Sequence, residues 1–242
     1  MSAMLLRIIA CVCMLIDHIG FQYNIYLFRC IGRIAFPIFV YLICNGYRYT
    51  SNRWRYALRL GIFALISQIP FSMFCYNSLW NRNGNVFVTL FLCLVCIWTA
   101  DVMLRRKKLR LIAFLPTLLI CALYYFDVLS SDYGIRGILF AMLFFFYAKH
   151  ERGWILPVGM LLAIYYPFLL GCTKWLFGSS FPTISRWEAT QIFSLCALPL
   201  VRSYNGLRGR APASPFLAKC FQIGFYLFYP VHMLALWIVR IF

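Results

Sequence analysis

The sequence predicts an all-α, polytopic integral membrane helical bundle, and composition is the first reason. Apolar residues make up 64% of the 242 residues, charged residues make up 12%, and the mean hydropathy is +0.80. Such values lie outside the range of water-soluble domains. The second reason is that apolar stretches of membrane-spanning length recur along the chain. Because an open sheet cannot satisfy its backbone hydrogen bonds in lipid, each stretch is expected to be a helix.

Charged, Gly-rich or Pro-rich breaks divide the chain into nine apolar stretches, at residues 4–22, 25–46, 57–76, 86–104, 109–129, 134–148, 154–172, 189–203 and 218–240. Most have the roughly 17–25 residues that a membrane span requires. The stretches 134–148 and 189–203 are short, so we expect about nine transmembrane helices within a range of eight to ten. No soluble domain or internal repeat interrupts the chain, which predicts a single transmembrane domain over residues 1–242.

The distribution of Lys and Arg predicts the orientation of this bundle. With the N-terminus in the cytoplasm, 16 of the 23 Lys and Arg residues fall on the cytoplasmic side of the nine-helix arrangement. This bias is the one that the positive-inside rule describes. The formal charge of +17 is therefore interpreted as a topology signal. Nucleic acid is not expected as a partner, since the basic residues lie between apolar spans.

The eleven cysteines are interpreted as small core residues. Their number is odd and nearly all lie within apolar spans, which argues against a disulfide framework. The pair Cys93 and Cys96 has the spacing of a metal site, but no second pair or neighbouring His accompanies it. No metal site is expected.

The first apolar stretch contains the most informative residues. Asp17 is one of only six acidic residues in the chain, and it precedes His18 in the middle of this stretch. Ionisable groups at membrane depth are costly and by default indicate function. Arg7 and His18 are expected on one face of the helix, with roughly 16 Å of rise between them. Arg7 would then hold a phosphate-bearing donor at the inner surface, and His18 would act as a general base.

Asp17 points about 100° away from His18 on a helix, so it is expected to pair with an Arg of another helix. Arg33, in the second stretch, is one candidate partner. Pro37 removes a backbone donor just beyond it and is expected to kink that helix. The pair is equally compatible with a structural ion pair and with a functional site.

Two further histidines lie elsewhere. His232 falls near the middle of the last stretch, among aromatic residues, and from the residues alone it is interpreted as a core histidine. His150 lies in a charged segment predicted to be a solvated inner loop, with no specific role.

Several motifs together resemble the TraX family, named for the enzyme that acetylates conjugative pilin. The motifs are Asp17-His18, Gly32-Arg33-x-Ala35-Phe36-Pro37, Ser67-Gln68-x-Pro70-Phe71, Asp132-Tyr133-Gly134, Tyr204-Asn205-Gly206-x-Arg208-Gly209 and Phe228-Tyr229-x-x-His232. The spacing of Arg7 and His18 is also similar to that in large membrane acyltransferases. These motifs span nearly the whole chain.

This resemblance implies a multi-pass acetyltransferase of the bacterial cytoplasmic membrane, with acetyl-CoA as donor substrate. Catalytic roles would fall on His18, Asp17 and His232, and cofactor-binding roles on Arg7 and Arg33. The acceptor would be an amine or hydroxyl at the outer face, on a pilin-like protein or a cell-surface glycan. Membrane lipid is the surrounding partner in either case.

Two other classes of function remain open at this stage. In a small-molecule or lipid transporter, Asp17, Arg33 and His232 would line a translocation path. In a non-catalytic membrane subunit, the same buried polar groups would only lock helices together.

Overall fold

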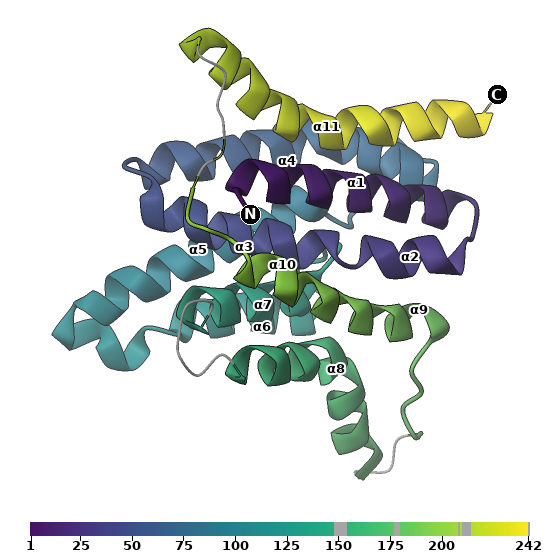
Figure 1. The fold of residues 1–242 in the computed structure, drawn as a ribbon. Coiled ribbons are helices and arrows are strands. Elements are labelled where there is room, and N and C mark those ends of the chain that lie inside the picture. The colour runs from purple at the N-terminus through teal and green to yellow at the C-terminus, as the bar shows by residue number, and fades with distance from the viewer. Residues whose placement is uncertain (148–153, 177–179, 208, 210–213, 242) are drawn as a thin grey trace.

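The computed structural model of the protein describes residues 1–147, 154–176, 180–207, 209 and 214–241. In this part of the chain the regular elements are all helices, and most of them lie roughly along one common axis (Figure 1). In chain order they are α1 (Ala3–Gln22), α2 (Tyr26–Gly32), α3 (Ala35–Tyr49), α4 (Arg53–Tyr76), α5 (Val86–Arg105), η1 (Lys107–Ile112), α6 (Leu115–Tyr125), α7 (Gly134–Tyr147), α8 (Ile155–Leu176), α9 (Arg186–Ala189), η2 (Thr190–Cys196), α10 (Ala197–Arg202) and α11 (Pro215–Ile241).

The prediction of an all-α polytopic bundle is confirmed, and the expected count of about nine transmembrane helices stays a prediction. Seven helical segments of the described residues are long and apolar enough to cross a membrane. The two remaining stretches are those already recognised as short. One is α7, with 14 residues, and the other is divided among α9, η2 and α10. In η2 the chain adopts the tighter 3₁₀ turn, whose hydrogen-bond geometry is poorer than that of an α-helix, so this stretch is not one continuous α-helix.

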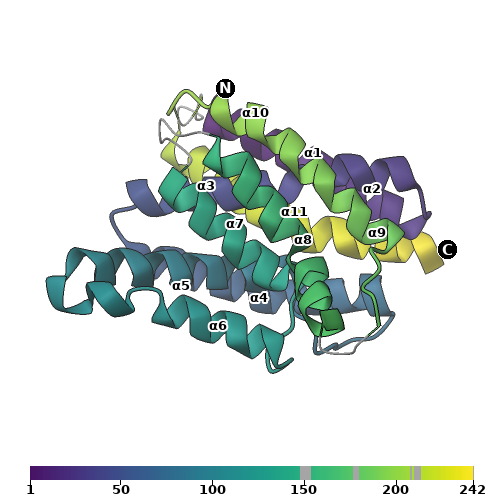
Figure 2. The same ribbon diagram turned by 90° about the horizontal axis from the view of Figure 1, so that it is seen from below.

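The spans alternate in direction along the chain, with α2 and α3 together forming one span, so the bundle has two ends. We call the end where α1, α4 and α11 begin the Arg7 end, and the opposite end, where α2, α5 and α7 begin, the His18 end. At the Arg7 end, the backbone of Ala3 donates to the Leu207 carbonyl at 2.9 Å, which fastens the start of α1 to the segment after α10. The helix α6 packs at the periphery against α5 and α7 (Figure 2).

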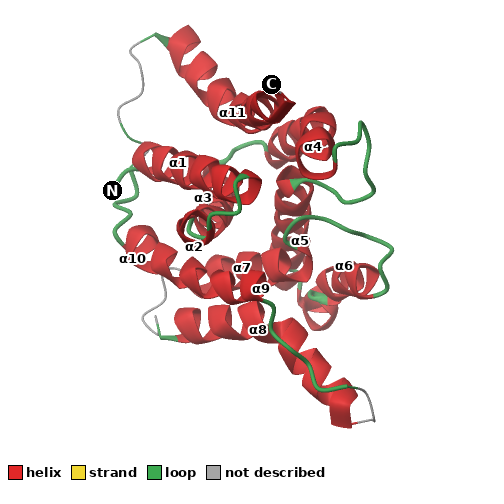
Figure 3. Cartoon of the chain, turned by 90° about the vertical axis from the view of Figure 1, so that its right-hand side faces the viewer, coloured by secondary structure: helices red, strands yellow, loops and turns green. Residues whose placement is uncertain are grey.

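The helix α3 lies in the interior of the bundle. Viewed from the His18 end, it continues behind α2 and is surrounded by α1, α5 and α7 (Figure 3). The predicted break occurs between these two helices, because α2 ends at Gly32 and α3 begins at Ala35. Pro37 has no N–H to donate to the carbonyl four residues earlier, that of Arg33, so the helical ladder is interrupted there. Arg33 lies at this break.

Two loops at the His18 end are fixed by polar contacts. Gln68 on α4 donates to the Asn83 carbonyl at 2.9 Å, and its side-chain oxygen accepts from the Asn85 amide, also at 2.9 Å. The backbone of Gly84 donates to the Ser130 carbonyl at 2.9 Å, and Asp132 donates back to Gly84 at 3.0 Å. These contacts hold the loop before α5 against the loop before α7.

Candidate functional site

The predicted pairing of Asp17 with Arg33 is present, and a second arginine joins it. The Arg33 Nη2 atom lies 2.6 Å from one Asp17 carboxylate oxygen and 2.9 Å from the other. The Arg29 Nη1 atom lies 2.5 Å from Asp17 Oδ2. Arg29 and Arg33 are four residues apart and therefore share a face, so both reach α1. Buried charges of opposite sign make each other tolerable in a low-dielectric interior.

The two intramembrane histidines, 214 positions apart in sequence, contact each other directly. His18 Nδ1 lies 2.7 Å from His232 Nε2, and His232 Nδ1 lies 2.6 Å from the carbonyl oxygen of Phe228. The edges of Phe74 and Tyr229 pack against the His18 ring, with centroids 5.6 Å and 6.2 Å away. His18 is thus held from several sides by aromatic contacts and one hydrogen bond.

A cavity of about 260 Å³, here called the site cavity, joins these groups at the His18 end. His18, Asp17, Arg29 and Arg33 all line it, and aromatic side chains such as Phe71 also contribute to its walls. Its mixture of a few polar groups with apolar walls is typical of small-molecule sites.

Asp132 also lines the site cavity. It is an exposed residue, and its backbone is fixed by the contact with Gly84. The next residue, Tyr133, stacks on Phe36 of α3 with ring centroids 3.5 Å apart. Asp132 therefore adds a second carboxylate to the site cavity, from a loop held by backbone hydrogen bonds, whereas the Asp17 carboxylate is already engaged by two guanidinium groups.

Arg7 lies apart from this cluster, toward the other end of α1. Its guanidinium is 5.9 Å from the centre of the Phe225 ring, and it lines two further cavities. One is a middle cavity of about 100 Å³, and the other is an entrance cavity of about 360 Å³ at the Arg7 end.

The three cavities follow one another along the bundle. The entrance and middle cavities share lining residues that include Arg7, Tyr56 and Phe225. The middle and site cavities share four residues, which we call the neck: Met14, Phe39, Val86 and Tyr229. A series of adjacent cavities thus extends from Arg7 to His18.

Most of this cluster was predicted from the sequence, but several of its members were not. Arg29 was counted only as a basic residue, although its i, i+4 relation to Arg33 would have placed both on one face. Asp132 was noted only within a motif, and the neck was not anticipated, because it joins side chains from four helices. His150 lies outside the described residues. Within those residues, no group of three metal-ligating side chains occurs.

Fold and site together define a polytopic helical membrane protein with an intramembrane pair of histidines beside an Asp–Arg cluster. The family model described as "TraX protein" matches residues 2–240, so the chain belongs to the TraX family. A curated relative is the "Probable fimbrial assembly protein FimC, serogroup H1" of Dichelobacter nodosus. It is 26% identical over 257 residues, which cover 100% of this chain and 96% of the relative. No solved structure matches the chain.

Proposed function

We propose that this protein is a membrane acetyltransferase that takes acetyl groups from cytoplasmic acetyl-CoA. The acceptor is an amine or hydroxyl on the other side of the bacterial cytoplasmic membrane, on a pilin-like protein or a surface glycan. The observation that carries the proposal is the series of three cavities from Arg7 to His18. Membership of the TraX family and the fimbrial assembly name of the relative support a pilus subunit as the acceptor.

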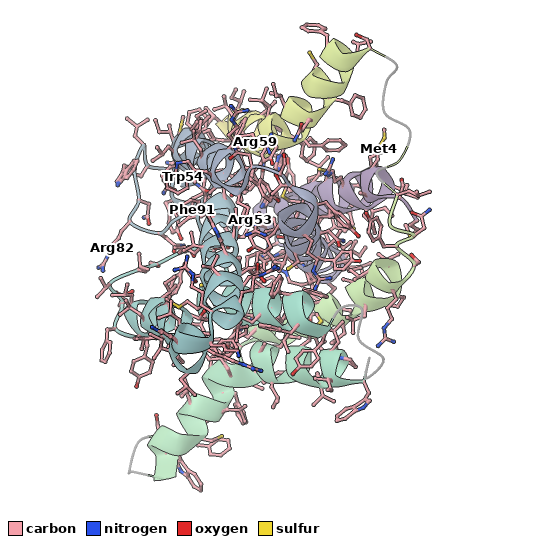
Figure 4. The ribbon with its side chains drawn as sticks, turned by 90° about the vertical axis from the view of Figure 1, so that its left-hand side faces the viewer. Met4, Arg53, Trp54, Arg59, Arg82 and Phe91 are labelled. Atoms are coloured by element: carbon pink, nitrogen blue, oxygen red, sulfur yellow. The ribbon has the colours of Figure 1, made fainter. Side chains whose placement is uncertain are left out.

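The entrance cavity suits the anionic end of the donor. Arg7 and Arg59 line it, together with polar side chains such as Asn45 and Thr50. Figure 4 views the molecule from the left-hand side of Figure 1 and labels Arg59 among the side chains of α4. Guanidinium groups bind phosphate bidentately, so a nucleotide with several phosphates is a fitting ligand here. By the positive-inside rule this end faces the cytoplasm, where acetyl-CoA is available.

The middle cavity suits the thioester-bearing arm of the same donor. It is narrow, and its walls are largely apolar and aromatic, with Leu60, Phe87 and Tyr226 among the lining residues. An uncharged, extended arm can lie in such a space without leaving ionic groups unpaired. An arm that passes the neck presents its thioester to the site cavity.

The site cavity supplies the groups for acyl transfer. The His18 imidazole accepts the proton of the acceptor amine or hydroxyl while that atom forms a bond to the thioester carbonyl carbon. Arg29 and Arg33 supply N–H donors beside the oxygen that becomes negatively charged. The carbon–sulfur bond then breaks, and the coenzyme A thiolate leaves with the proton held by His18. An amine that enters as ammonium releases its additional proton to water.

The test is transfer across a sealed membrane. The protein is reconstituted in vesicles that enclose acetyl-labelled acetyl-CoA, and a peptide with a free N-terminal amine is supplied outside. We expect label on the external peptide, and a loss of about 100-fold or more in His18→Ala, since general base catalysis contributes roughly 10²–10⁴-fold.

His150→Ala is the matched control, because that histidine has no place in the proposed mechanism. Full turnover by His18→Ala would refute the mechanism. Label that never leaves acetyl-CoA, together with peptide-independent uptake of a solute, would favour a transporter instead.

A further inference from the structure

We infer that His232 is a positioning residue that acts through His18 by fixing the position of its ring proton, and that the basic atom in the site cavity is His18 Nε2. The inference rests on the proposed function for the role of that atom in acyl transfer. The assignment of the proton itself rests on hydrogen-bond geometry alone.

The assignment begins at the Phe228 carbonyl oxygen, which can accept a hydrogen bond but cannot donate one. His232 Nδ1 lies 2.6 Å from this oxygen, so Nδ1 carries the proton. A neutral imidazole has one N–H, which leaves a lone pair on His232 Nε2. His18 Nδ1 lies 2.7 Å from that nitrogen and must therefore be the donor. With Nδ1 protonated, neutral His18 keeps its lone pair on Nε2.

The orientation of the two rings supports a hydrogen bond in the ring plane. Their planes are inclined by only 22°, and their centroids lie 4.9 Å apart. That separation is close to the N···N distance plus two ring radii, so the rings meet edge to edge. In this geometry the N–H bond of His18 points along the lone pair of His232.

The remaining His18 nitrogen is on the reactive side. His18 lines the site cavity, whereas His232 is absent from its lining. The His18 nitrogen that does not face His232 is therefore the one available to an acceptor. When Nε2 takes a proton, the His18–His232 hydrogen bond becomes charge-assisted and stronger. His232 thus takes the place that a carboxylate occupies in a Ser-His-Asp triad, but as a neutral group.

The helix α11 provides the acceptor for His232. Phe228 lies four residues before His232, on the same face of the helix. A carbonyl oxygen has two lone pairs, so the Phe228 oxygen can accept from the His232 ring in addition to a backbone donor. The stacking of Phe228 on the His232 ring, with centroids 4.8 Å apart, further restricts the ring.

The first test reads the tautomer directly and needs no activity. In ¹⁵N-histidine-labelled protein in lipid, NMR is expected to show neutral His18 protonated at Nδ1. In His232→Phe, which preserves an aromatic ring but removes both nitrogens, His18 is expected to change to protonation at Nε2. Finding Nε2–H in the native protein, or no change in the variant, would overturn the inference even if acetyl transfer occurs.

The second test is kinetic. In His232→Phe we expect kcat to fall by roughly 100-fold, within the range for loss of general base function, with KM for acetyl-CoA unchanged. His232→Gln retains an acceptor oxygen for His18 and an amide donor for the Phe228 carbonyl. Its kcat is therefore expected to be at least tenfold higher than that of His232→Phe. Val231→Ala is the matched control on α11, since this residue is 60% exposed and lines none of the three cavities.

Equal losses in His232→Phe and His232→Gln, with the tautomer unchanged, would show a packing role only. If the native protein has the Nδ1–H tautomer but no variant, including His18→Ala, affects transfer, the proposed function fails while the proton assignment stands.

Discussion

Gly32 of α2 lies directly against Asp17 of α1: a Cβ atom built on Gly32 would be 2.1 Å from the Asp17 Cβ and 2.2 Å from its Oδ1. Real Cβ atoms do not approach other heavy atoms so closely. The absence of a side chain at Gly32 is therefore what permits α1 and α2 to approach closely enough for Asp17 to reach both arginines.

This contact predicts that Gly32→Ala is destabilising. The added methyl group must displace Asp17 or separate the two helices, at a cost of about 1–3 kcal/mol, as in other overpacked interiors. Unfolding in mild detergent with increasing denaturant measures it. Gly224→Ala is the matched control, since no atom lies within 4 Å of a Cβ there. Equal stability of the two variants would contradict the close contact.

Asp17→Asn is expected to lower the free energy of unfolding of the bundle substantially, with a smaller effect on the rate of acetyl transfer. Removal of the carboxylate leaves two adjacent guanidinium groups without a partner, which costs about 3–5 kcal/mol for a buried pair. Because the Asp17 carboxylate bonds to Arg29 and Arg33 rather than to His18, the folded fraction should keep its kcat within about tenfold, less than the range for loss of a general base. Thermal unfolding and activity per folded molecule separate the two effects. Unchanged stability with abolished activity would instead place Asp17 in catalysis.

Arg7→Ala is expected to weaken donor binding. A hydrogen bond to a charged group contributes about 1.5–3 kcal/mol, so KM for acetyl-CoA should rise roughly 10- to 100-fold, with a smaller change for the acceptor. The control is Arg55→Ala, an exposed arginine near the same end that lines none of the three cavities. Similar KM values for the two variants would remove Arg7 from the donor site.

The neck offers a steric test of the donor route. Phe39→Trp enlarges one of the four residues shared by the middle and site cavities, so acetyl transfer should fall at least tenfold, the equivalent of about 1.4 kcal/mol in the barrier. Phe114→Trp makes the same change just before α6, at a residue that is 44% exposed. Donor binding, measured by equilibrium dialysis, should survive in both variants if the nucleotide stays in the entrance cavity. Undiminished transfer by Phe39→Trp would exclude passage through the neck.

Asp132→Asn tests whether this second carboxylate of the site cavity recognises a cationic acceptor. Loss of a charge-assisted contact should raise KM for an amine acceptor about tenfold and leave a hydroxyl acceptor unaffected. Asp127→Asn is the control in the same loop, since that carboxylate is 80% exposed and lies 3.8 Å from Arg82. Equal effects on both acceptors would assign Asp132 to the scaffold.

The sequence by itself determined the class of fold and the identity of the buried ionisable groups. Apolar stretches of spanning length leave no alternative to helices in lipid, and a carboxylate at membrane depth requires a cationic partner such as Arg33. The position of Pro37 likewise determined where the second span is interrupted, because a missing N–H acts on a neighbour four residues away. Each of these features follows either from a single stretch of sequence or from the need to neutralise a buried charge.

Tertiary structure decided which distant residues meet. The contact between His18 and His232 joins helices at opposite ends of the chain, and helical periodicity defines a face of each without saying which helix it packs against. The neck and the number of full-length spans also depend on packing, since a 14-residue helix such as α7 is supported by its neighbours rather than by its own length. Helix-to-helix register was the missing information, and it is set by side-chain fit such as that of Gly32 against Asp17.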